Sequence, residues 1–114
     1  MSDCIFCGIA DGKIPAEKVH EDDSLVAFAD INPVAPVHIL IVPKKHIATL
    51  NDASSADEAL LGKILLCAKQ LAAERDLAEE GYRTVVNCMA GAGQSVFHIH
   101  AHLLGGRVLQ WPPG

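Results

Sequence analysis

The chain has 114 residues, half of them hydrophobic, and a formal net charge of -5. A chain of this length and composition can form one domain with its own core, so we expect a single domain over residues 1–114. The acidic balance argues against binding of long nucleic acid, which requires a basic surface, but does not exclude one bound nucleotide. Neither a secretory signal nor an apolar run long enough to span a membrane is present, so we expect a soluble, cytoplasmic protein with no membrane partner.

The first half of the chain predicts a short helix followed by strands. We expect a helix over residues 4–10, a hairpin formed by residues 18–21 and 24–30, and a nearly continuous apolar strand over residues 37–42. The segment 32–36 contains two prolines and cannot be a central strand, because proline lacks the backbone donor of a strand ladder.

The second half predicts one long helix and two further strands. The helix is expected to start at Ser55, with Glu58 completing a capping box, and to stop at Gly81. Strands are expected over residues 82–89 and 97–104. This order indicates an α+β fold, in which a mostly antiparallel sheet carries the long helix on one face. The residues of the apolar helix stripe are Leu61, Ile64, Leu65, Ala68, Leu71 and Ala72.

Three histidines alternate with apolar residues near the C-terminus: His98, His100 and His102. On a strand, alternate side chains share a face, so the pattern predicts three imidazoles in a row, with Ile99, Ala101 and Leu103 directed into a core. Imidazole is the side chain that titrates near neutral pH. The row therefore indicates proton transfer, nucleophilic attack or metal binding.

A glycine-containing loop, residues 90–95, directly precedes the histidine row. Its backbone N–H groups can form a nest for an anion, and the side chains of Gln94 and Ser95 add donors. No Asp or Glu lies beside the row to complete a hydrolytic metal site. We therefore favour an imidazole that attacks phosphorus over a row that binds a metal, although His-x-His on a strand is also a known zinc ligand pair.

Cys4 and Cys7 place two sulfur atoms on one turn of the predicted N-terminal helix. Two thiolates make half of a zinc site, for which His46 and His98 are candidate third and fourth ligands. The alternative is a pair of unremarkable thiols beside a surface His46. His38 is either a partner of the histidine row or a half-buried histidine with ordinary contacts. Cys67 and Cys88 are expected to be small core residues.

These residues resemble the histidine triad (HIT) superfamily, whose signature is His-φ-His-φ-His-φ-φ with φ apolar. Further segments are similar to its Hint branch, the nucleoside phosphoramidate hydrolases, and the match covers nearly the whole chain. These segments are residues 30–38 (DINPVAPVH), 43–47 (PKKHI), 93–96 (GQSV), 105–107 (GGR) and 111–114 (WPPG).

The resemblance implies a five-stranded HIT-like fold with a long and a short N-terminal helix, and a homodimer in which two sheets join into one. It also implies hydrolysis of the P–N bond in purine nucleoside 5′-phosphoramidates. His100 would be the nucleophile, with His98, His102 and Ser95 as the other catalytic residues, and Asp30 would take the ribose hydroxyls. Residues implied around the phosphate are Asn87, Gly93, Gln94, Ser95, Val96 and His102; those of the base slot are Ile5, Phe6, Ile9, Phe28 and Ile31.

Two points remain open at the level of sequence. Zinc-carrying members of the superfamily have a cysteine pair like Cys4 and Cys7, with histidines matching His46 and His98, which favours a structural zinc and requires no catalytic metal. Residues 88–90 replace a more polar, acidic stretch of the Hint pattern, so the resemblance does not define the leaving group. The alternatives are hydrolysis of dinucleoside polyphosphates and a non-enzymatic nucleotide-binding or scaffold protein.

Overall fold

A computed structural model describes residues 4–114 of the chain. Helix α1 (Ile5–Ala10) is followed by strands β1 (Lys18–Glu21), β2 (Leu25–Ala29) and β3 (Val37–Pro43), then by helix α2 (Glu58–Glu74), and finally by strands β4 (Tyr82–Val85) and β5 (Ala101–Gly105). The five strands form one sheet in the order β1-β2-β3-β5-β4, and every neighbouring pair is antiparallel. The predicted α+β fold is therefore confirmed.

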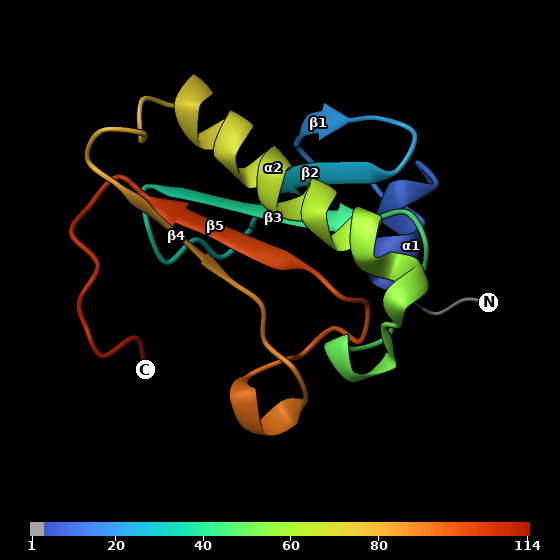
Figure 1. The fold of residues 1–114 in the computed structure, drawn as a ribbon. Coiled ribbons are helices and arrows are strands. Elements are labelled where there is room, and N and C mark those ends of the chain that lie inside the picture. Colours follow the sequence, from blue (N-terminus) through green and yellow to red (C-terminus); the bar gives the residue numbers. More distant parts are fainter. Residues whose placement is uncertain (1–3) are drawn as a thin grey trace.

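The sheet buries apolar side chains on both faces, because α2 crosses one face and α1 packs on the other (Figure 1). Alternation along β2 and β3 divides their residues between two cores. Leu25 and Ile41 lie in the core beneath α2, whereas Val26 and Leu40 lie in a second core with Phe6 of α1. This explains why β2 and β3 read as nearly continuous apolar runs.

Helix α2 is shorter than predicted at both ends. It begins at Glu58 after a 3-10 turn (Ser55–Asp57), and the capping box is formed by Ser54 and Asp57 rather than by Ser55 and Glu58. It ends at Glu74, well before the expected stop at Gly81. Asp76 takes a positive φ of 60°, and this left-handed turn ends the helix and brings Leu77 into the core.

The last two strands are also shorter than predicted, and this shapes the histidine segment. Residues 86–89 lie outside β4, and β5 begins only at Ala101, so His98 and His100 precede the strand that contains His102. Their backbone is held by other contacts, including an Ile99 N–H that donates to the Ile47 carbonyl at 2.7 Å. The apolar half of the predicted alternation is confirmed, because Ile99, Ala101 and Leu103 are all buried.

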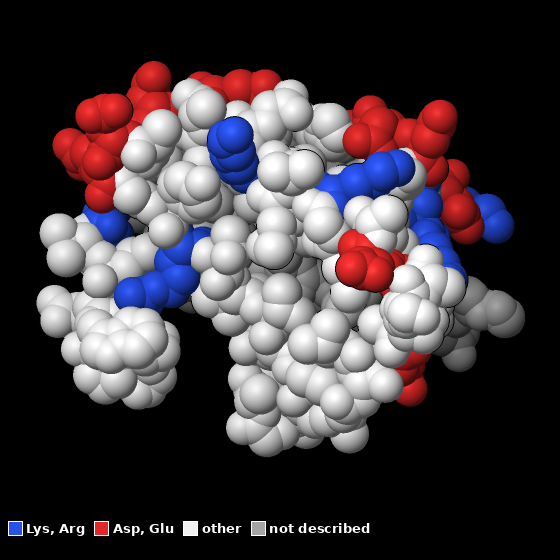
Figure 2. All heavy atoms as spheres, viewed as in Figure 1, with Lys and Arg blue, Asp and Glu red and all other residues white. Residues whose placement is uncertain are grey.

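The predicted apolar stripe of α2 is mostly, but not entirely, on its buried side. Ile64, Ala68, Leu71 and Ala72 are buried, together with Cys67, whereas Leu65 is 53% exposed. Within residues 4–114, no helix combines the length and the apolar character that a membrane crossing requires. On the face shown in Figure 2, acidic side chains gather along the upper rim, and basic ones are scattered rather than joined into one surface.

Truncation of Leu71 should test the packing of α2 on the sheet. This side chain is 1% exposed, so Leu71→Ala should lower the free energy of unfolding by about 2–5 kcal/mol. Leu66 lies on the same helix but is 65% exposed, so Leu66→Ala should change stability by about 0.5 kcal/mol or less. Urea denaturation of both variants measures the difference, and equal losses would contradict the burial pattern.

Candidate active site and metal-binding cluster

A cleft of about 510 Å³ lies on the α1 side of the sheet and contains most of the predicted nucleotide-binding residues. One wall is apolar, and Phe6 packs edge-to-face on both Phe28 and His100, with ring centroids 5.5 and 5.0 Å apart. At its mouth Ile31 is 91% exposed and Ile5 47% exposed. The sequence-predicted residues that line the cleft are Ile5, Phe6, Ile9, Phe28, Asp30, Ile31, Ser95, Val96, His100 and His102.

The tautomer of His100 follows from one hydrogen bond. Its Nδ1 lies 2.8 Å from the backbone carbonyl oxygen of His98, and a carbonyl can only accept, so Nδ1 carries the proton and donates. In the neutral ring, Nε2 then holds the free lone pair. Burial lowers the pKa of His100, so the neutral form dominates at pH 7. His100 is thus a neutral imidazole with a nucleophilic nitrogen in the wall of the cleft.

His102, His38 and Asp30 form a second network next to His100. The Val34 N–H donates to His38 Nδ1 at 3.1 Å, so the His38 proton is on Nε2. This Nε2–H lies 2.9 Å from His102 Nδ1 and 3.3 Å from an Asp30 carboxylate oxygen. His102 Nδ1 therefore accepts, and its own proton is on Nε2. Burial and the neighbouring rings of His100 and His38 lower the pKa of His102 to about 4.

The same hydrogen bonds argue against a metal ion between Asp30, His38 and His102, although their ligand atoms are close together. A metal would need the lone pair of His38 Nε2, which would move the ring proton to Nδ1. Nδ1 would then face the Val34 N–H, donor against donor. The arrangement is that of a hydrogen-bond chain which holds His102 in one tautomer.

A separate cluster of four side chains could hold a metal ion: Cys4, Cys7, His46 and His98. The Nδ1 atoms of His46 and His98 are 3.1 Å apart, and each lies 3.3 Å from one cysteine sulfur. With metal bonds of about 2.3 Å to sulfur and 2.0–2.1 Å to nitrogen, neighbouring ligand atoms of a tetrahedral zinc site lie about 3.3–3.8 Å apart. The observed spacings are close to these values.

His98 is also in the right tautomer to be a ligand. Its Nε2 lies 2.7 Å from the carbonyl oxygen of Pro43, so Nε2 carries the proton and Nδ1 presents a lone pair to the cluster. A ligand histidine whose other nitrogen donates to a carbonyl is the usual arrangement at metal sites. The ring is fully buried, and burial lowers its pKa, which favours the neutral form that a metal needs.

The loop before the histidines contributes to the cleft less directly than predicted. The Gln94 side chain is buried and points into the loop: its Oε1 accepts from the Met89 N–H, and its Nε2 donates to the carbonyl oxygens of Ala48 and Val96. Gln94 therefore supports the loop rather than lining the cleft. Ser95 and Val96 line the cleft, whereas Gly93, with φ of 98°, and the half-buried Asn87 do not.

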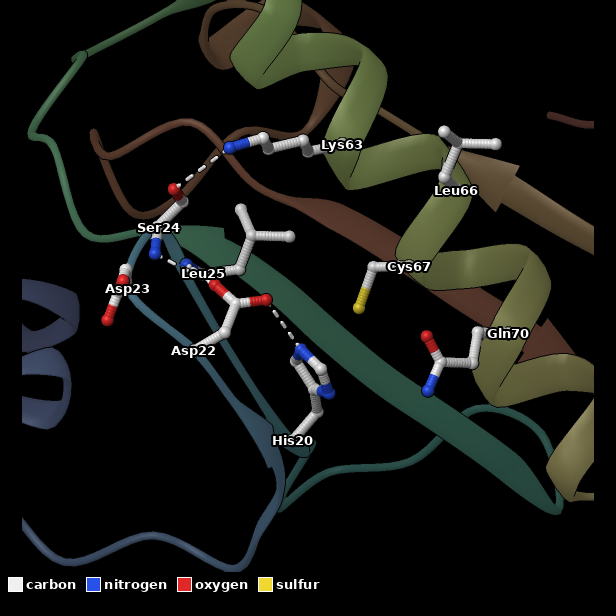
Figure 3. Close-up of a pocket in the computed structure, with 9 residues that line it drawn as sticks. All are labelled: His20, Asp22, Asp23, Ser24, Leu25, Lys63, Leu66, Cys67 and Gln70. Atoms are coloured by element: carbon white, nitrogen blue, oxygen red, sulfur yellow. Dashed lines mark hydrogen bonds and ion pairs between the residues drawn. The ribbon is translucent and has the colours of Figure 1, made fainter.

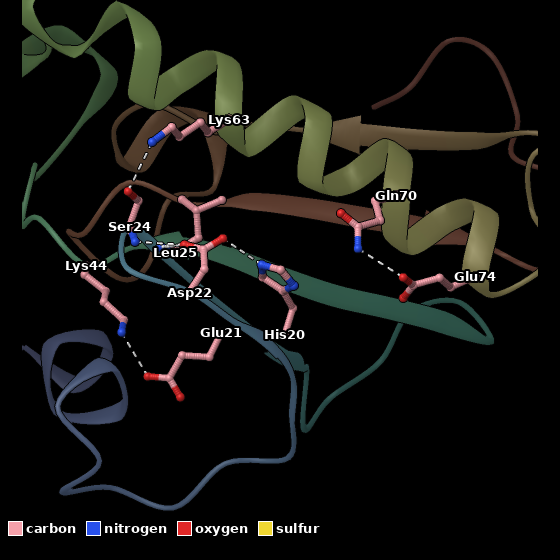
Figure 4. Close-up of polar contacts among 9 residues, drawn as sticks. All are labelled: His20, Glu21, Asp22, Ser24, Leu25, Lys44, Lys63, Gln70 and Glu74. Carbon is pink, nitrogen blue, oxygen red and sulfur yellow. Dashed lines mark hydrogen bonds and ion pairs between the residues drawn. The ribbon is translucent and has the colours of Figure 1, made fainter.

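A second hollow, of about 420 Å³, lies on the other face of the sheet, between α2 and the β1–β2 turn (Figure 3). Several of its polar groups already pair with one another, as Figure 4 shows: His20 lies 2.8 Å from Asp22, and Lys63 donates to Ser24. Burial raises the pKa of Cys67 to about 11, so its thiol is protonated and unreactive at pH 7. The histidine cleft is therefore the better candidate for chemistry.

Known proteins resemble this chain in sequence and in fold. The HIT domain family model matches residues 11–109. An uncharacterized HIT-like protein of Synechococcus elongatus is 54% identical over 98% of this chain and 97% of its own length. A crystal structure of a HIT family hydrolase from Legionella pneumophila is 57% identical and covers 98% of this chain and 100% of its own, with a TM-score of 0.97. A zinc-bound histidine triad family protein from Mycobacterium smegmatis is 31% identical, covers 92% of this chain and 76% of its own, and has a TM-score of 0.81.

Proposed function

Because the chain belongs to the HIT domain family, we propose that it hydrolyses purine nucleoside 5′-phosphoramidates to a nucleoside monophosphate and an amine. The observation that carries the proposal is the fixed tautomer of His100, whose Nε2 lone pair is available in a cleft with one apolar and one polar side. A structural neighbour from Legionella pneumophila is described as a HIT family hydrolase, which supports hydrolysis in general.

In the proposed first step, His100 Nε2 attacks the phosphorus atom, the P–N bond breaks, and a nucleotidyl-histidine forms. The departing nitrogen takes up a proton, for which the His102 Nε2–H and the Ser95 hydroxyl are the nearby donors that line the cleft. In the second step, water attacks the same phosphorus, the bond between phosphorus and His100 Nε2 breaks, and the proton lost by the water returns to the donor that served the first step. Donors of the loop at Ser95 and Val96, which line the cleft, would stabilise charge on the phosphoryl oxygens.

The purine ring and the ribose of the nucleotide match the apolar wall and the Asp30 carboxylate of the cleft, respectively. A purine ring is flat and apolar on both faces, which suits the aromatic and aliphatic wall around Phe6 and Phe28 and the exposed Ile31 at the mouth. Asp30 is held by the Asn32 N–H at 2.8 Å and by His38. Its carboxylate has lone pairs left for the two ribose hydroxyls, so we assign the ribose to Asp30.

We propose that the Cys4, Cys7, His46 and His98 cluster holds a structural zinc ion. Two sulfur and two imidazole ligands make a closed tetrahedral set with no position left for a substrate. Zinc there would fix the N-terminus of α1 and the histidine segment to each other. All proposed reaction steps are performed by the side chains and backbone of the cleft.

We also propose a homodimer through the edge strand β4, whose outer side has no partner strand among residues 4–114. Beside it, an apolar groove is lined by residues that include Leu61, Leu65 and Val86. An exposed strand edge next to exposed apolar side chains favours pairing with a second copy. Two β4 strands around a two-fold axis would join the sheets into one, and Trp111, which is 79% exposed, would have a second chain to pack against.

Substitution of His100 tests the reaction. His100→Ala should abolish turnover of an adenosine 5′-phosphoramidate, while AMP affinity stays within about threefold, because the apolar wall and Asp30 remain. Mass spectrometry of quenched reactions should detect a nucleotidyl adduct in the wild type only. Retained turnover in His100→Ala would refute the mechanism. Faster turnover of a diadenosine polyphosphate would favour that substrate class, and AMP binding without any turnover would indicate a nucleotide-binding protein.

Metal analysis tests the zinc proposal. The untagged protein should contain one zinc per chain, and Cys4→Ser should lose the metal and unfold at a lower temperature, because three ligands hold zinc less tightly than four. Cys88→Ser, at a cysteine outside the cluster, is the matched control and should keep its zinc. A metal-free wild type with the same melting temperature after zinc addition would contradict the proposal.

Two neighbouring leucines on α2 test the dimer. Leu65 lines the groove beside β4, whereas Leu66 lines the hollow on the other side of the helix. Sedimentation should give twice the chain mass of 12.1 kDa for the wild type and for Leu66→Lys, but the single mass for Leu65→Lys at micromolar concentration. Both variants are expected to fold because both side chains are more than half exposed. A monomeric wild type would exclude the dimer.

A further inference from the structure

Residues 4–7 connect the metal-binding cluster to the apolar wall of the cleft. Cys4 is the N-cap of α1, and its sulfur accepts from the Cys7 N–H at 3.4 Å. Two residues further on, Phe6 packs edge-to-face on the ring of His100, with centroids 5.0 Å apart. A change at the two sulfur atoms therefore acts on the segment that positions Phe6.

His98 connects the same cluster to the proposed nucleophile. Its ring offers Nδ1 to the cluster, and its backbone carbonyl accepts the His100 Nδ1–H at 2.8 Å. That single bond fixes the His100 tautomer. The cluster thus positions Phe6 in the wall of the cleft and the His98 carbonyl that orients His100. These two groups come from distant parts of the sequence.

We propose that Cys4 and Cys7 form a redox-sensitive latch for the cleft: oxidation of the pair by a peroxide joins the two sulfurs in a disulfide, releases the metal ion and disables nucleotide binding and turnover. The effects on turnover and on nucleotide binding rest on the proposed function, whereas disulfide formation and release of the metal ion do not. Both sulfurs are only half-buried, and all four ligand atoms lie within 4.8 Å of one another, so the pair is reachable and close enough to react.

The oxidation balances with a peroxide as the two-electron oxidant. One cysteine thiolate attacks a peroxide oxygen, the O–O bond breaks, and a sulfenic acid forms with loss of hydroxide, or of alkoxide from an alkyl peroxide. The second thiolate then attacks this sulfur and expels hydroxide. With hydrogen peroxide, two thiolates, one peroxide and two protons give one disulfide and two water molecules. A disulfide no longer supplies thiolate ligands, so the metal ion leaves.

The experiment treats the zinc-loaded full chain with equimolar hydrogen peroxide and follows four quantities. Zinc release is read with a chromogenic chelator, the disulfide by peptide mass mapping, AMP affinity by calorimetry, and turnover with the phosphoramidate. We expect one zinc released per Cys4–Cys7 disulfide, with AMP affinity and turnover each falling at least tenfold in step with it. A dithiol reductant with added zinc should restore both.

Two variants locate the effect. The double variant Cys67→Ser/Cys88→Ser lacks the other two cysteines and should respond to peroxide as the wild type does. In Cys4→His/Cys7→His the cluster has no thiol, so peroxide should leave its zinc content and AMP affinity at their own starting values. If this variant does not fold, the disulfide map and the Cys67→Ser/Cys88→Ser protein still decide the question.

Three results would overturn the latch: AMP affinity within twofold of the untreated value after complete Cys4–Cys7 oxidation, peroxide sensitivity that disappears in Cys67→Ser/Cys88→Ser, or a wild type that binds no metal. Absence of turnover before oxidation would refute the proposed reaction alone, because the latch would then be judged by AMP affinity. The failure of one proposal is therefore distinguishable from the failure of the other.

Discussion

The organisation of the site depends on the three contacts of His98. Its Nε2 donates to the carbonyl oxygen of Pro43 at the end of β3, its Nδ1 faces the sulfur and imidazole groups of the cluster, and its own carbonyl accepts from His100. The first two contacts restrain the orientation of the buried His98 ring, and the third joins its backbone to the His100 ring. Burial of an imidazole without hydrogen-bond partners would lower the free energy of unfolding. These contacts give both ring nitrogens of His98 a partner, so the ring can be fully buried.

The late start of β5, at Ala101, agrees with the same contacts. Had residues 98 and 100 continued β5, their carbonyls would be directed toward a neighbouring strand. Instead, the His98 carbonyl is taken by the His100 ring, and the Ile99 N–H is taken by Ile47 from the segment after β3. The His98 carbonyl, which would accept from a neighbouring strand in a regular sheet, instead accepts from His100 Nδ1–H and fixes the tautomer of that ring. Strand β5 contains His102, and the other two histidines lie in the segment directly before this strand.

Sequence reasoning predicted the elements and the residues of the cleft better than their boundaries and hydrogen bonds. The spacing of apolar residues along strands and helices reflects which side chains are buried. Ile99, Ala101 and Leu103 are buried as their alternation with the histidines predicts. The ends of α2 and β4 depend on backbone turns, such as the positive φ at Asp76. An aspartate predicts such a turn less strongly than the glycine at position 81 does. The orientation of Gln94 depends on acceptors far along the chain, including Ala48, and no local pattern contains that information.

Residues 4–114 contain two histidine–aspartate contacts, and comparing them shows why composition alone does not define a site. His20 and Asp22 are two residues apart and partly exposed, and Asp22 also accepts from the Ser24 and Leu25 N–H groups, which together hold the pKa of its carboxyl at about 2. Water competes for that pair, so it does little more than close a turn. His38 and Asp30 come from different segments, and the His38 side chain is only 4% exposed. Removed from water, the second contact can orient another imidazole, His102, and through it one side of the cleft. Burial and long-range convergence, rather than the residue types themselves, separate the pair that supports chemistry from the pair that supports a turn.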